Sequence, residues 1–341
     1  MIGETPSRLV DAYDLVILDL DGVVYLIDRP IPGAVEAIAE LHRSGPPVAY
    51  ATNNASRRAA EVAELLTNIG VVVSALEVLT SAQAAAALLR ERFTAGSPVL
   101  VVGAEALRAE IRAAELTPVS HADEAPVAVV QGYGPRVGWP ELAEACVAIR
   151  AGAVWVATNT DRTLPTTRGP LPGNGALVAA LRTALDRDPD VVVGKPEPTL
   201  FTAAARRVGA LRPLVVGDRL DTDIEGAVRA GMDSLLVLTG VAGASDLLAA
   251  PPARRPTHVA ADLSGLFDVD AAVRIPLLGP AAGGWRVARG ADGALALAGH
   301  GDPLEALRLL CGAAWAEPEL SRLVARSPAA EAALRVLGLA G

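Results

Sequence analysis

The sequence predicts an α/β protein: a doubly wound parallel sheet, an inserted second α/β unit, and a small α+β segment at the carboxyl end. Short β-branched runs alternate with alanine- and leucine-rich stretches at helical spacing, which is typical of a parallel sheet with crossover helices. About 140 residues separate Asn54 from Lys195, whereas a crossover needs only a few tens. A glycine- and proline-rich stretch at residues 276–284 then marks a change of pattern.

The apolar runs and the helical spacing place each element of this sheet. We expect strands at residues 15–20, 48–52, 99–102, 127–130, 154–157, 191–193, 214–216 and 235–238. We expect helices at residues 33–43, 57–69, 81–92, 105–114, 141–151, 176–186, 198–208 and 221–230. Several of these helices are followed by glycine, the residue that most often ends a helix.

The surplus between Asn54 and Lys195 carries its own strands and helices, so we expect it to fold as a separate unit. The predicted boundaries are 1–78 and 191–270 for the core and 79–190 for the insertion. Residues 280–341 are predicted to form a hairpin followed by two helices. The hairpin strands are expected at residues 285–289 and 294–297, and the helices at 303–316 and 318–337.

Composition narrows the class of protein. The chain has 341 residues, enough for roughly two domains, and its net charge of −9 argues against non-specific binding to nucleic acid or to an anionic membrane. Cys146 and Cys311 form no CxxC motif or disulfide framework, which fits a reducing compartment. The start of the chain does not resemble a signal peptide, and no apolar run is long enough to span a bilayer. We therefore expect a soluble, cytoplasmic protein without membrane insertion.

The basic residues are almost all arginine. Of the 30 lysine and arginine residues, 29 are arginine, and Lys195 is the single lysine. An ammonium group is a compact point charge that can press against one oxygen of a phosphate, whereas a guanidinium is a broad fork. Lys195 follows the predicted strand 191–193, in the sequence Gly194-Lys195-Pro196. A phosphate-binding role and an ordinary surface charge are both open for it at this point.

Two aspartates follow the first predicted strand. Asp19 and Asp21 stand at the carboxyl edge of a buried strand, where open α/β sheets hold their ligands. A calcium loop of the EF-hand type beginning at Asp19 is excluded, because it would have Val24 in place of glycine and Pro30 in place of glutamate. A turn or helix cap built from the two aspartates remains an alternative.

Polar residues also follow the predicted strands at residues 48–52 and 214–216. Thr52, Asn53 and Asn54 end the second strand, and their hydroxyl, amide and N–H groups suit a phosphate oxygen, although Ser56 could simply cap the next helix.

The strand at residues 214–216 leads to Asp218 and Asp223. Asp223 could instead complement the dipole of the following helix. The combination of these features at four strand ends is far less probable by accident than any one of them.

At these positions the sequence resembles the haloacid dehalogenase superfamily of phosphotransferases. The four motifs are Asp19-Leu20-Asp21-Gly22, Thr52-Asn53-Asn54, Lys195-Pro196, and Gly217-Asp218 with Asp223. The resemblance spans roughly residues 12–265, and it is strongest to the class with a large α/β cap after the second motif, class IIA. It implies a Rossmann-like core carrying a C2-type cap. The layout, including the extra carboxyl-terminal segment, is similar to actinobacterial glycerol 3-phosphate phosphatases.

The resemblance implies a role for each motif residue. Asp19 would be the nucleophile that forms an aspartyl-phosphate, and Asp21 the general acid and base. Mg²⁺ would be bound by the carboxylates of Asp19 and Asp218 and by the backbone carbonyl of Asp21, with Asp223 orienting its water shell.

Substrate contacts are implied in the same way. The phosphoryl oxygens would be held by a set of four residues: Thr52, Asn53, Asn54 and Lys195. In the cap, Arg162, Leu164 and Asn174 match segments that face the active site in similar phosphatases, so the resemblance implies contacts with the leaving group.

The resemblance implies hydrolysis of a small phosphorylated metabolite. Glycerol 3-phosphate is the favoured substrate, which implies a role in glycerophospholipid metabolism. Pyridoxal phosphate, phosphoglycolate and nucleotides are alternative substrates, and a non-catalytic phosphoacceptor is the competing class of protein. The tail from about residue 284 resembles a reduced acetyltransferase-like module without an acetyl-CoA pyrophosphate loop. A structural or dimerising role, as in a homodimer, is favoured for it over a second activity.

Overall fold

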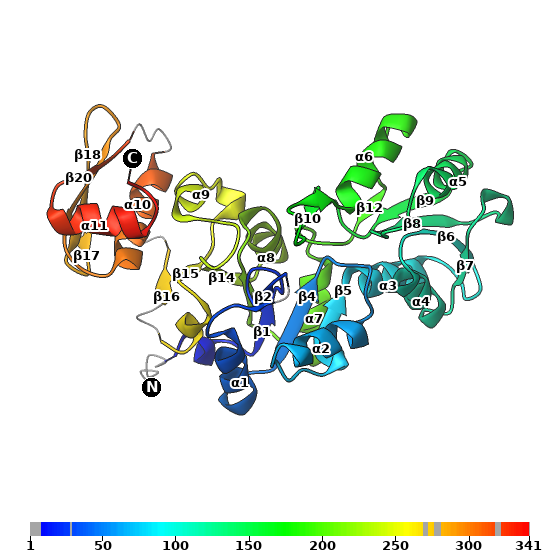
Figure 1. The fold of residues 1–341 in the computed structure, drawn as a ribbon, viewed down its shortest axis with the longest axis horizontal. Coiled ribbons are helices and arrows are strands. Elements are labelled where there is room, and N and C mark those ends of the chain that lie inside the picture. The colour runs from blue at the N-terminus through cyan, green and yellow to red at the C-terminus, as the bar shows by residue number, and fades with distance from the viewer. Residues whose placement is uncertain (1–7, 28, 269–271, 276–280, 318–321, 341) are drawn as a thin grey trace. The chain divides into compact units, whose positions relative to one another are not determined.

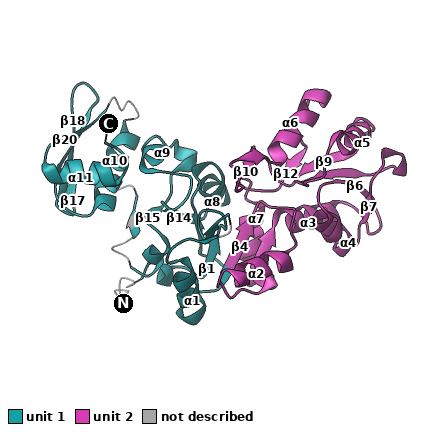
Figure 2. Ribbon diagram, in the orientation of Figure 1, with its two compact units in different colours: residues 1–48, 209–341 teal, residues 49–208 magenta. Residues whose placement is uncertain are grey.

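A computed structural model describes residues 8–27, 29–268, 272–275, 281–317 and 322–340 (Figure 1). The chain forms two compact units, coloured separately in Figure 2. Unit 1 comprises residues 1–48 and 209–341, and unit 2 comprises residues 49–208.

Unit 1 contains the strands that follow one another as β16-β15-β14-β13-β1. The four strands β1 (Leu15–Leu18), β13 (Pro213–Gly217), β14 (Asp233–Val237) and β15 (His258–Ala260) are parallel, and β16 (Ala272–Arg274) runs antiparallel to β15. Every residue of β1 and β13 is buried, which explains their continuous apolar runs.

Short helices and turns connect these strands. They are η1 (Leu9–Ala12), the small hairpin of β2 (Tyr25–Leu26) and β3 (Arg29–Pro30), α1 (Ala34–Ser44), the wide turn η4 (Leu220–Ile224), α8 (Glu225–Ala230), α9 (Ala244–Leu248), η5 (Pro252–Arg254) and η6 (Leu263–Leu266). The turn η4 runs directly into α8, so the predicted helix 221–230 is half turn and half helix.

Unit 2 begins with β4 (Val48–Thr52), whose first residue closes the preceding unit, and β5 (Val78–Thr80) pairs parallel with it. The helices beside this pair are α2 (Ala59–Asn68), η2 (Ala75–Glu77), α3 (Ser81–Arg92) and α7 (Thr199–Val208).

A parallel five-stranded sheet in the order β12-β9-β8-β6-β7 forms the rest of unit 2. Its strands are β6 (Pro98–Val102), β7 (Thr117–Val119), β8 (Ala128–Gln131), β9 (Val154–Ala157) and β12 (Val191–Val192). It is accompanied by α4 (Glu105–Ala113), η3 (Ala122–Glu124), α5 (Trp139–Arg150), the hairpin β10 (Thr163–Leu164) and β11 (Leu171–Pro172), and α6 (Asn174–Leu185).

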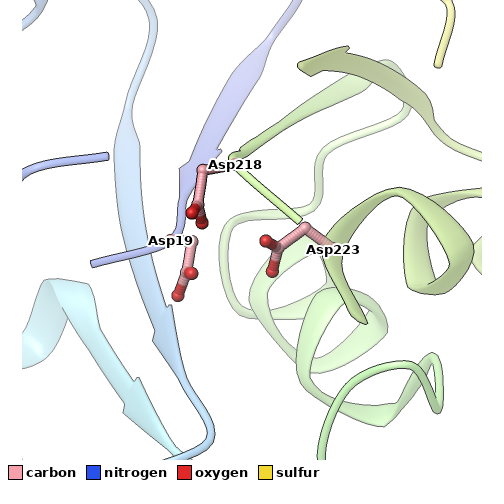
Figure 3. A group of neighbouring side chains, drawn as sticks. All are labelled: Asp19, Asp218 and Asp223. Atoms are coloured by element: carbon pink, nitrogen blue, oxygen red, sulfur yellow. The ribbon is translucent and has the colours of Figure 1, made fainter. Parts of the chain in front are cut away.

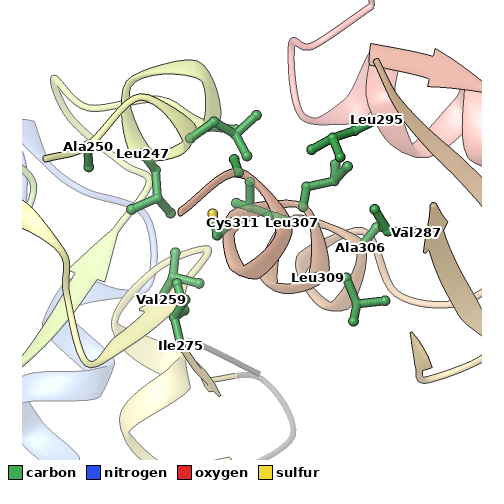
Figure 4. Packing of buried hydrophobic residues seen from close by; sticks show 14 of the residues in the cluster. Leu247, Ala250, Val259, Ile275, Val287, Leu295, Ala306, Leu307, Leu309 and Cys311 are labelled. Atoms are coloured by element: carbon green, nitrogen blue, oxygen red, sulfur yellow. The ribbon is translucent and has the colours of Figure 1, made fainter. Parts of the chain in front are cut away.

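The carboxyl-terminal module is a four-stranded sheet with two helices. It contains β17 (Ala281–Ala282), β18 (Trp285–Arg289), β19 (Leu295–Gly299), α10 (Pro303–Ala316), β20 (Leu323–Ala325) and α11 (Pro328–Val336). Figure 4 shows Leu307 and Cys311 of α10 buried in the same cluster as Leu247 of α9 and Val259 of β15. The module therefore shares a hydrophobic core with the parallel sheet of unit 1.

Most predicted elements are confirmed to within two residues, including the hairpin and the helix at 303–316. The helix predicted at 318–337 is confirmed over α11, Pro328–Val336, but it is wrong at residues 323–325, which form β20. The Ser327 hydroxyl accepts the N–H of Ala330 and caps that helix. Residues 318–321 lie outside the described residues.

The strands β5, β7, β15 and β16 were not predicted, because each has only three residues and carries little periodicity.

Within the described part of the chain, no helix combines the length and the apolar character that crossing a bilayer demands.

His258 is a buried histidine in β15. Its side chain is 6% exposed, and it lies opposite Arg274 of β16 in the strand register. Burial, with the positive charge of Arg274 as a further cause, lowers the pKa of His258 to about 4, while Asp233 acts in the opposite direction. The folded protein therefore holds this imidazole neutral at pH values where an unfolded chain would protonate it.

We expect the free energy of unfolding to fall as the pH is lowered from about 6.5 to about 4, because the unfolded chain then binds a proton that folded His258 excludes. This one group accounts for about 3 kcal/mol over that window. Urea unfolding at a series of pH values checks it, with His258→Leu as the comparison. Parallel pH profiles for the two proteins would contradict the assignment.

Candidate active site

Three carboxylates meet at the carboxyl ends of two adjacent strands. Asp19 follows β1 and Asp218 follows β13, and the parallel register sets Leu18 opposite Val216. Because parallel strands end at the same edge of a sheet, both side chains leave the sheet together. Asp223 lies on the wide turn η4 directly after them. One carboxylate oxygen from each aspartate lies within 4.8 Å of the others, and all three point into the same space (Figure 3).

The backbone around the carboxylates holds them in place. The N–H of Val241 donates to Asp218 Oδ2 at 2.7 Å, and the N–H of Ala242 donates to the Asp218 carbonyl at 2.9 Å. The N–H of Arg219 donates to Asp223 Oδ2 at 3.2 Å. The two side-chain bonds fix the direction in which Asp218 and Asp223 present their remaining oxygen lone pairs.

Three glycines lie so close to the carboxylates that a side chain at any of them would clash. A methyl group at Gly22 or at Gly240 would overlap Asp218 Oδ2, and a methyl group at Gly217 would overlap the Asp223 side chain. Gly22 also has a φ of +79°, a conformation that side chains with a Cβ rarely adopt. The glycines therefore form a cradle that closes tightly around two of the three carboxylates.

This donor set fits Mg²⁺. Asp19, Asp218 and Asp223 are 7%, 1% and 0% exposed, so water screens their mutual repulsion poorly. Two like charges 4.8 Å apart repel by about 3 kcal/mol at an effective dielectric constant of 20. A small divalent cation offsets that repulsion, and carboxylate oxygens with water are the ligands that Mg²⁺ prefers. Asp21 is half-buried and does not belong to the carboxylate cluster.

The residues predicted to bind the phosphoryl oxygens meet in unit 2. Lys195 is 3% exposed, and its Nζ donates to the Ala51 carbonyl at 3.3 Å. Asn53 Oδ1 accepts the N–H of Lys195 at 2.7 Å, and Asn53 Nδ2 donates to the Lys195 carbonyl at 3.1 Å. Thr52 is 3% exposed, and its Oγ1 accepts the N–H of Asn54 at 3.1 Å. The ends of β4 and of the strand before Lys195 thus form a second cluster.

Ser56 is not the helix cap that the sequence allowed. Its N–H and hydroxyl donate to Asn54 Oδ1 at 2.8 and 2.7 Å, and α2 begins only at Ala59. The Glu61 carboxylate accepts the N–H of Arg58 at 2.6 Å and satisfies the start of that helix. Asn54 itself is exposed.

The three predicted cap residues differ in their surroundings. Arg162 is exposed, and Leu164 is half-buried in β10. Asn174 is 1% exposed, and its Nδ2 donates to the Asn159 carbonyl at 2.7 Å and to the Gln131 carbonyl at 3.3 Å. Both amide hydrogens of Asn174 therefore hold backbone within unit 2.

Sequence reasoning missed Asp161. Its carboxylate oxygens lie 3.2 and 3.1 Å from Asn53 Nδ2, which donates to them. A signal for it existed, because Thr158-Asn159-Thr160-Asp161 follows β9 in the same way that polar residues follow the other strands. The match of this segment to similar phosphatases implies a leaving-group contact for Arg162 and none for Asp161.

Comparison with known families agrees with this geometry. Residues 16–117 match the haloacid dehalogenase-like hydrolases, and residues 192–266 match a second model described as HAD-hydrolase-like. Residues 282–339 match a GCN5-related N-acetyltransferase-like domain, which confirms the resemblance predicted for the tail. The chain belongs to the haloacid dehalogenase-like hydrolase family, as a phosphoric monoester hydrolase of class IIA. The competing class, a non-catalytic phosphoacceptor, is therefore not retained.

The relatives of this chain in sequence include a bacterial and a mouse protein. The chain is 47% identical over 296 residues to a D-glycerol 3-phosphate phosphatase of Mycobacterium tuberculosis, covering 87% of this chain and 81% of the relative. It is 39% identical to chronophin of Mus musculus, covering 66% and 81%.

The solved structures include a glycerol phosphate phosphatase of M. tuberculosis in complex with magnesium, with a TM-score of 0.90, 45% identity, and coverage of 98% of this chain and all of that one. A 4-nitrophenylphosphatase from Thermotoga maritima has a TM-score of 0.71 at 32% identity, and the match covers 76% and 98% of the two chains.

Gly240→Ala tests the cation site without measuring activity. The added methyl group would displace the Asp218 carboxylate, so we expect Mg²⁺ affinity, measured by titration calorimetry, to fall by at least about 10-fold. Gly243→Ala is the matched control, because a Cβ there meets only Asp246 Oδ2 at 3.7 Å. Equal Mg²⁺ affinity in the two variants would show that Asp218 is not a ligand.

Proposed function

We propose that the protein is a Mg²⁺-dependent phosphatase that hydrolyses glycerol 3-phosphate through an aspartyl-phosphate on Asp19. The observation that carries the proposal is the buried group of Asp19, Asp218 and Asp223 at the strand ends. Structural and sequence similarity to a glycerol phosphate phosphatase supports the choice of substrate.

Charge is the main obstacle to the reaction. A phosphate monoester carries close to two negative charges near neutral pH, and a carboxylate nucleophile adds another. Asp19, Asp218 and the Asp21 backbone carbonyl would hold Mg²⁺, with Asp223 orienting its water shell. When bound, Mg²⁺ supplies positive charge that offsets this repulsion.

Asp19 and Asp21 act in both halves of the reaction. An Asp19 carboxylate oxygen attacks phosphorus, and the bond from phosphorus to the ester oxygen breaks. The Asp21 carboxyl group gives its proton to that oxygen, and the alcohol leaves. Asp21, now a carboxylate, takes a proton from water, which attacks the phosphorus of the aspartyl-phosphate and releases phosphate and the Asp19 carboxylate.

The second cluster would bind the phosphoryl group. Lys195 offers an ammonium group, and the Thr52 hydroxyl and the N–H groups of this loop offer hydrogen-bond donors. Asn54 contributes at the exposed end of the same loop. In this proposal the aspartates bind the metal, and Lys195 binds the phosphoryl oxygens.

The cap supplies the leaving-group side. We assign this side to a set of three residues on the segment after β9 and at the start of α6: Arg162, Leu164 and Asn174. Asn174 would act by shaping the segment, since its amide hydrogens are bonded to backbone carbonyls. Pyridoxal phosphate, phosphoglycolate and nucleotides are the alternative substrates of the same class.

The organisation of the chain follows the same proposal. Residues 1–78 and 191–270 would be the phosphatase core, residues 79–190 the cap, and residues 280–341 a structural or dimerising module. Within the described residues both cysteines are free thiols, which supports a cytoplasmic location. A role in glycerophospholipid metabolism follows from the proposed substrate.

Asp19→Asn removes the nucleophile and nearly preserves the shape of the side chain. We expect turnover to fall at least about 100-fold, with the fold kept. Phosphate release from glycerol 3-phosphate and thermal unfolding check the two parts. Residual turnover above about 1% in a folded variant would count against Asp19 as the nucleophile.

A substrate panel tests the specificity. We expect glycerol 3-phosphate to give the highest kcat/KM among phosphorylated polyols, pyridoxal phosphate, phosphoglycolate and nucleotides, and chelation of Mg²⁺ to abolish phosphate release from all of them. Inorganic phosphate release, with and without Mg²⁺, is the measurement. A higher kcat/KM for another member of the panel would replace glycerol 3-phosphate by that compound.

A further inference from the structure

The carboxamide of Asn53 pairs with the main chain of Lys195. The Lys195 N–H donates to Asn53 Oδ1 at 2.7 Å, and Asn53 Nδ2 donates to the Lys195 carbonyl at 3.1 Å. One side chain thereby binds both polar backbone groups of a residue that is distant in sequence. This fixes the point from which the lysine side chain starts.

Asp161 sets the orientation of that carboxamide. Asn53 Nδ2 lies 3.2 and 3.1 Å from the two carboxylate oxygens of Asp161. A primary amide has two N–H groups, and here one is directed to the Lys195 carbonyl and the other is shared between the two carboxylate oxygens. Because a carboxylate only accepts, the nitrogen must face Asp161, and the oxygen is left for the Lys195 N–H.

The backbone around this pair is held equally tightly. The Asn53 carbonyl accepts Asn159 Nδ2 at 2.7 Å and Ser81 Oγ at 2.6 Å, and Asn159 Oδ1 accepts the N–H of Asp161 at 3.1 Å. A Cβ at Gly194 would lie 2.5 Å from the Thr158 carbonyl oxygen and 2.7 Å from Asn53 Oδ1. The segment after β9, the loop after β4 and the residue before Lys195 are therefore packed as one assembly.

We propose that Asn53 and Asp161 are positioning residues that hold Lys195 where it binds a phosphoryl oxygen. The inference rests on the proposed function, in which Lys195 binds phosphate. It changes the role that the family resemblance implied for Asn53: its side-chain hydrogens are used by Lys195 and Asp161, so the side chain acts through the lysine. Asp161 belongs to the cap segment, and it thereby links that segment to the phosphate-binding lysine.

Asn53→Asp tests the pairing with little change of shape. The new oxygen cannot donate to the Lys195 carbonyl, and it would face the Asp161 carboxylate. We expect the Kd for inorganic phosphate, measured by titration calorimetry in the presence of Mg²⁺, to rise at least about 10-fold. Asn68→Asp is the matched control, because Asn68 is exposed at the end of α2 and receives the same chemical change.

Asp161→Asn separates positioning from charge. If Asp161 acted only through its negative charge, removing that charge would strengthen phosphate binding. Positioning predicts the opposite, because Asn53 loses the acceptor that orients it, and we expect the Kd to rise about 3- to 10-fold. In the double variant, Asn53→Asp with Asp161→Asn, an amide again faces a carboxylate, so we expect the loss to be smaller than with Asn53→Asp alone.

Two results would overturn the inference. One is phosphate binding by Asn53→Asp that matches Asn68→Asp, and the other is tighter binding by Asp161→Asn than by the unchanged protein. Absence of phosphate binding by the unchanged protein would overturn it as well. Failure of the proposed function looks different: phosphate affinity would change as described, but the unchanged protein would release phosphate from no ester.

Discussion

The parallel pairing of β1 with β13 is the constraint on which the candidate site depends. The register that sets Leu18 opposite Val216 brings the next residue of the first strand, Asp19, and the residue after the second, Asp218, to one edge of the sheet. A shift of one residue would turn one of these side chains to the other face. The buried apolar strands fix the register, so the hydrophobic core of unit 1 also determines where the negative charge collects.

Repulsion among the three buried carboxylates opposes folding. Backbone groups are packed closely around them and hold them in place. Backbone N–H groups of Val241 and Arg219 donate to the carboxylates, and glycines at 22, 217 and 240 leave no room for a side chain. Val241 leads directly into α9, which packs on α10 of the carboxyl-terminal module (Figure 4). The module and the loop that holds Asp218 therefore belong to one packed body, which fits a structural role for the tail.

The sequence predicted the fold well where elements were long and periodic, and it predicted that Asp19, Asp218 and Asp223 lie together. Asp19, Asp218 and Asp223 could be placed because each follows a buried strand or its turn. The role of Asn53 could not be predicted, because its hydrogen bonds join residues that are far apart in sequence. The motif Thr52-Asn53-Asn54 is equally consistent with a loop that binds the ligand directly. The helix predicted over β20 failed because the three-residue strand has no periodicity of its own.

The choice of a single lysine in an arginine-rich chain follows from the space around it. Lys195 is buried, its Nζ reaches the Ala51 carbonyl, and its main chain is paired with Asn53. A guanidinium has five N–H donors that all need acceptors when buried, whereas an ammonium has three and can direct one at a single phosphoryl oxygen. The backbone before Lys195 is closely packed as well, because a Cβ at Gly194 would lie 2.5 Å from the Thr158 carbonyl oxygen. Because the lysine is buried and its main chain is paired with Asn53, we expect its position to depend on that carboxamide.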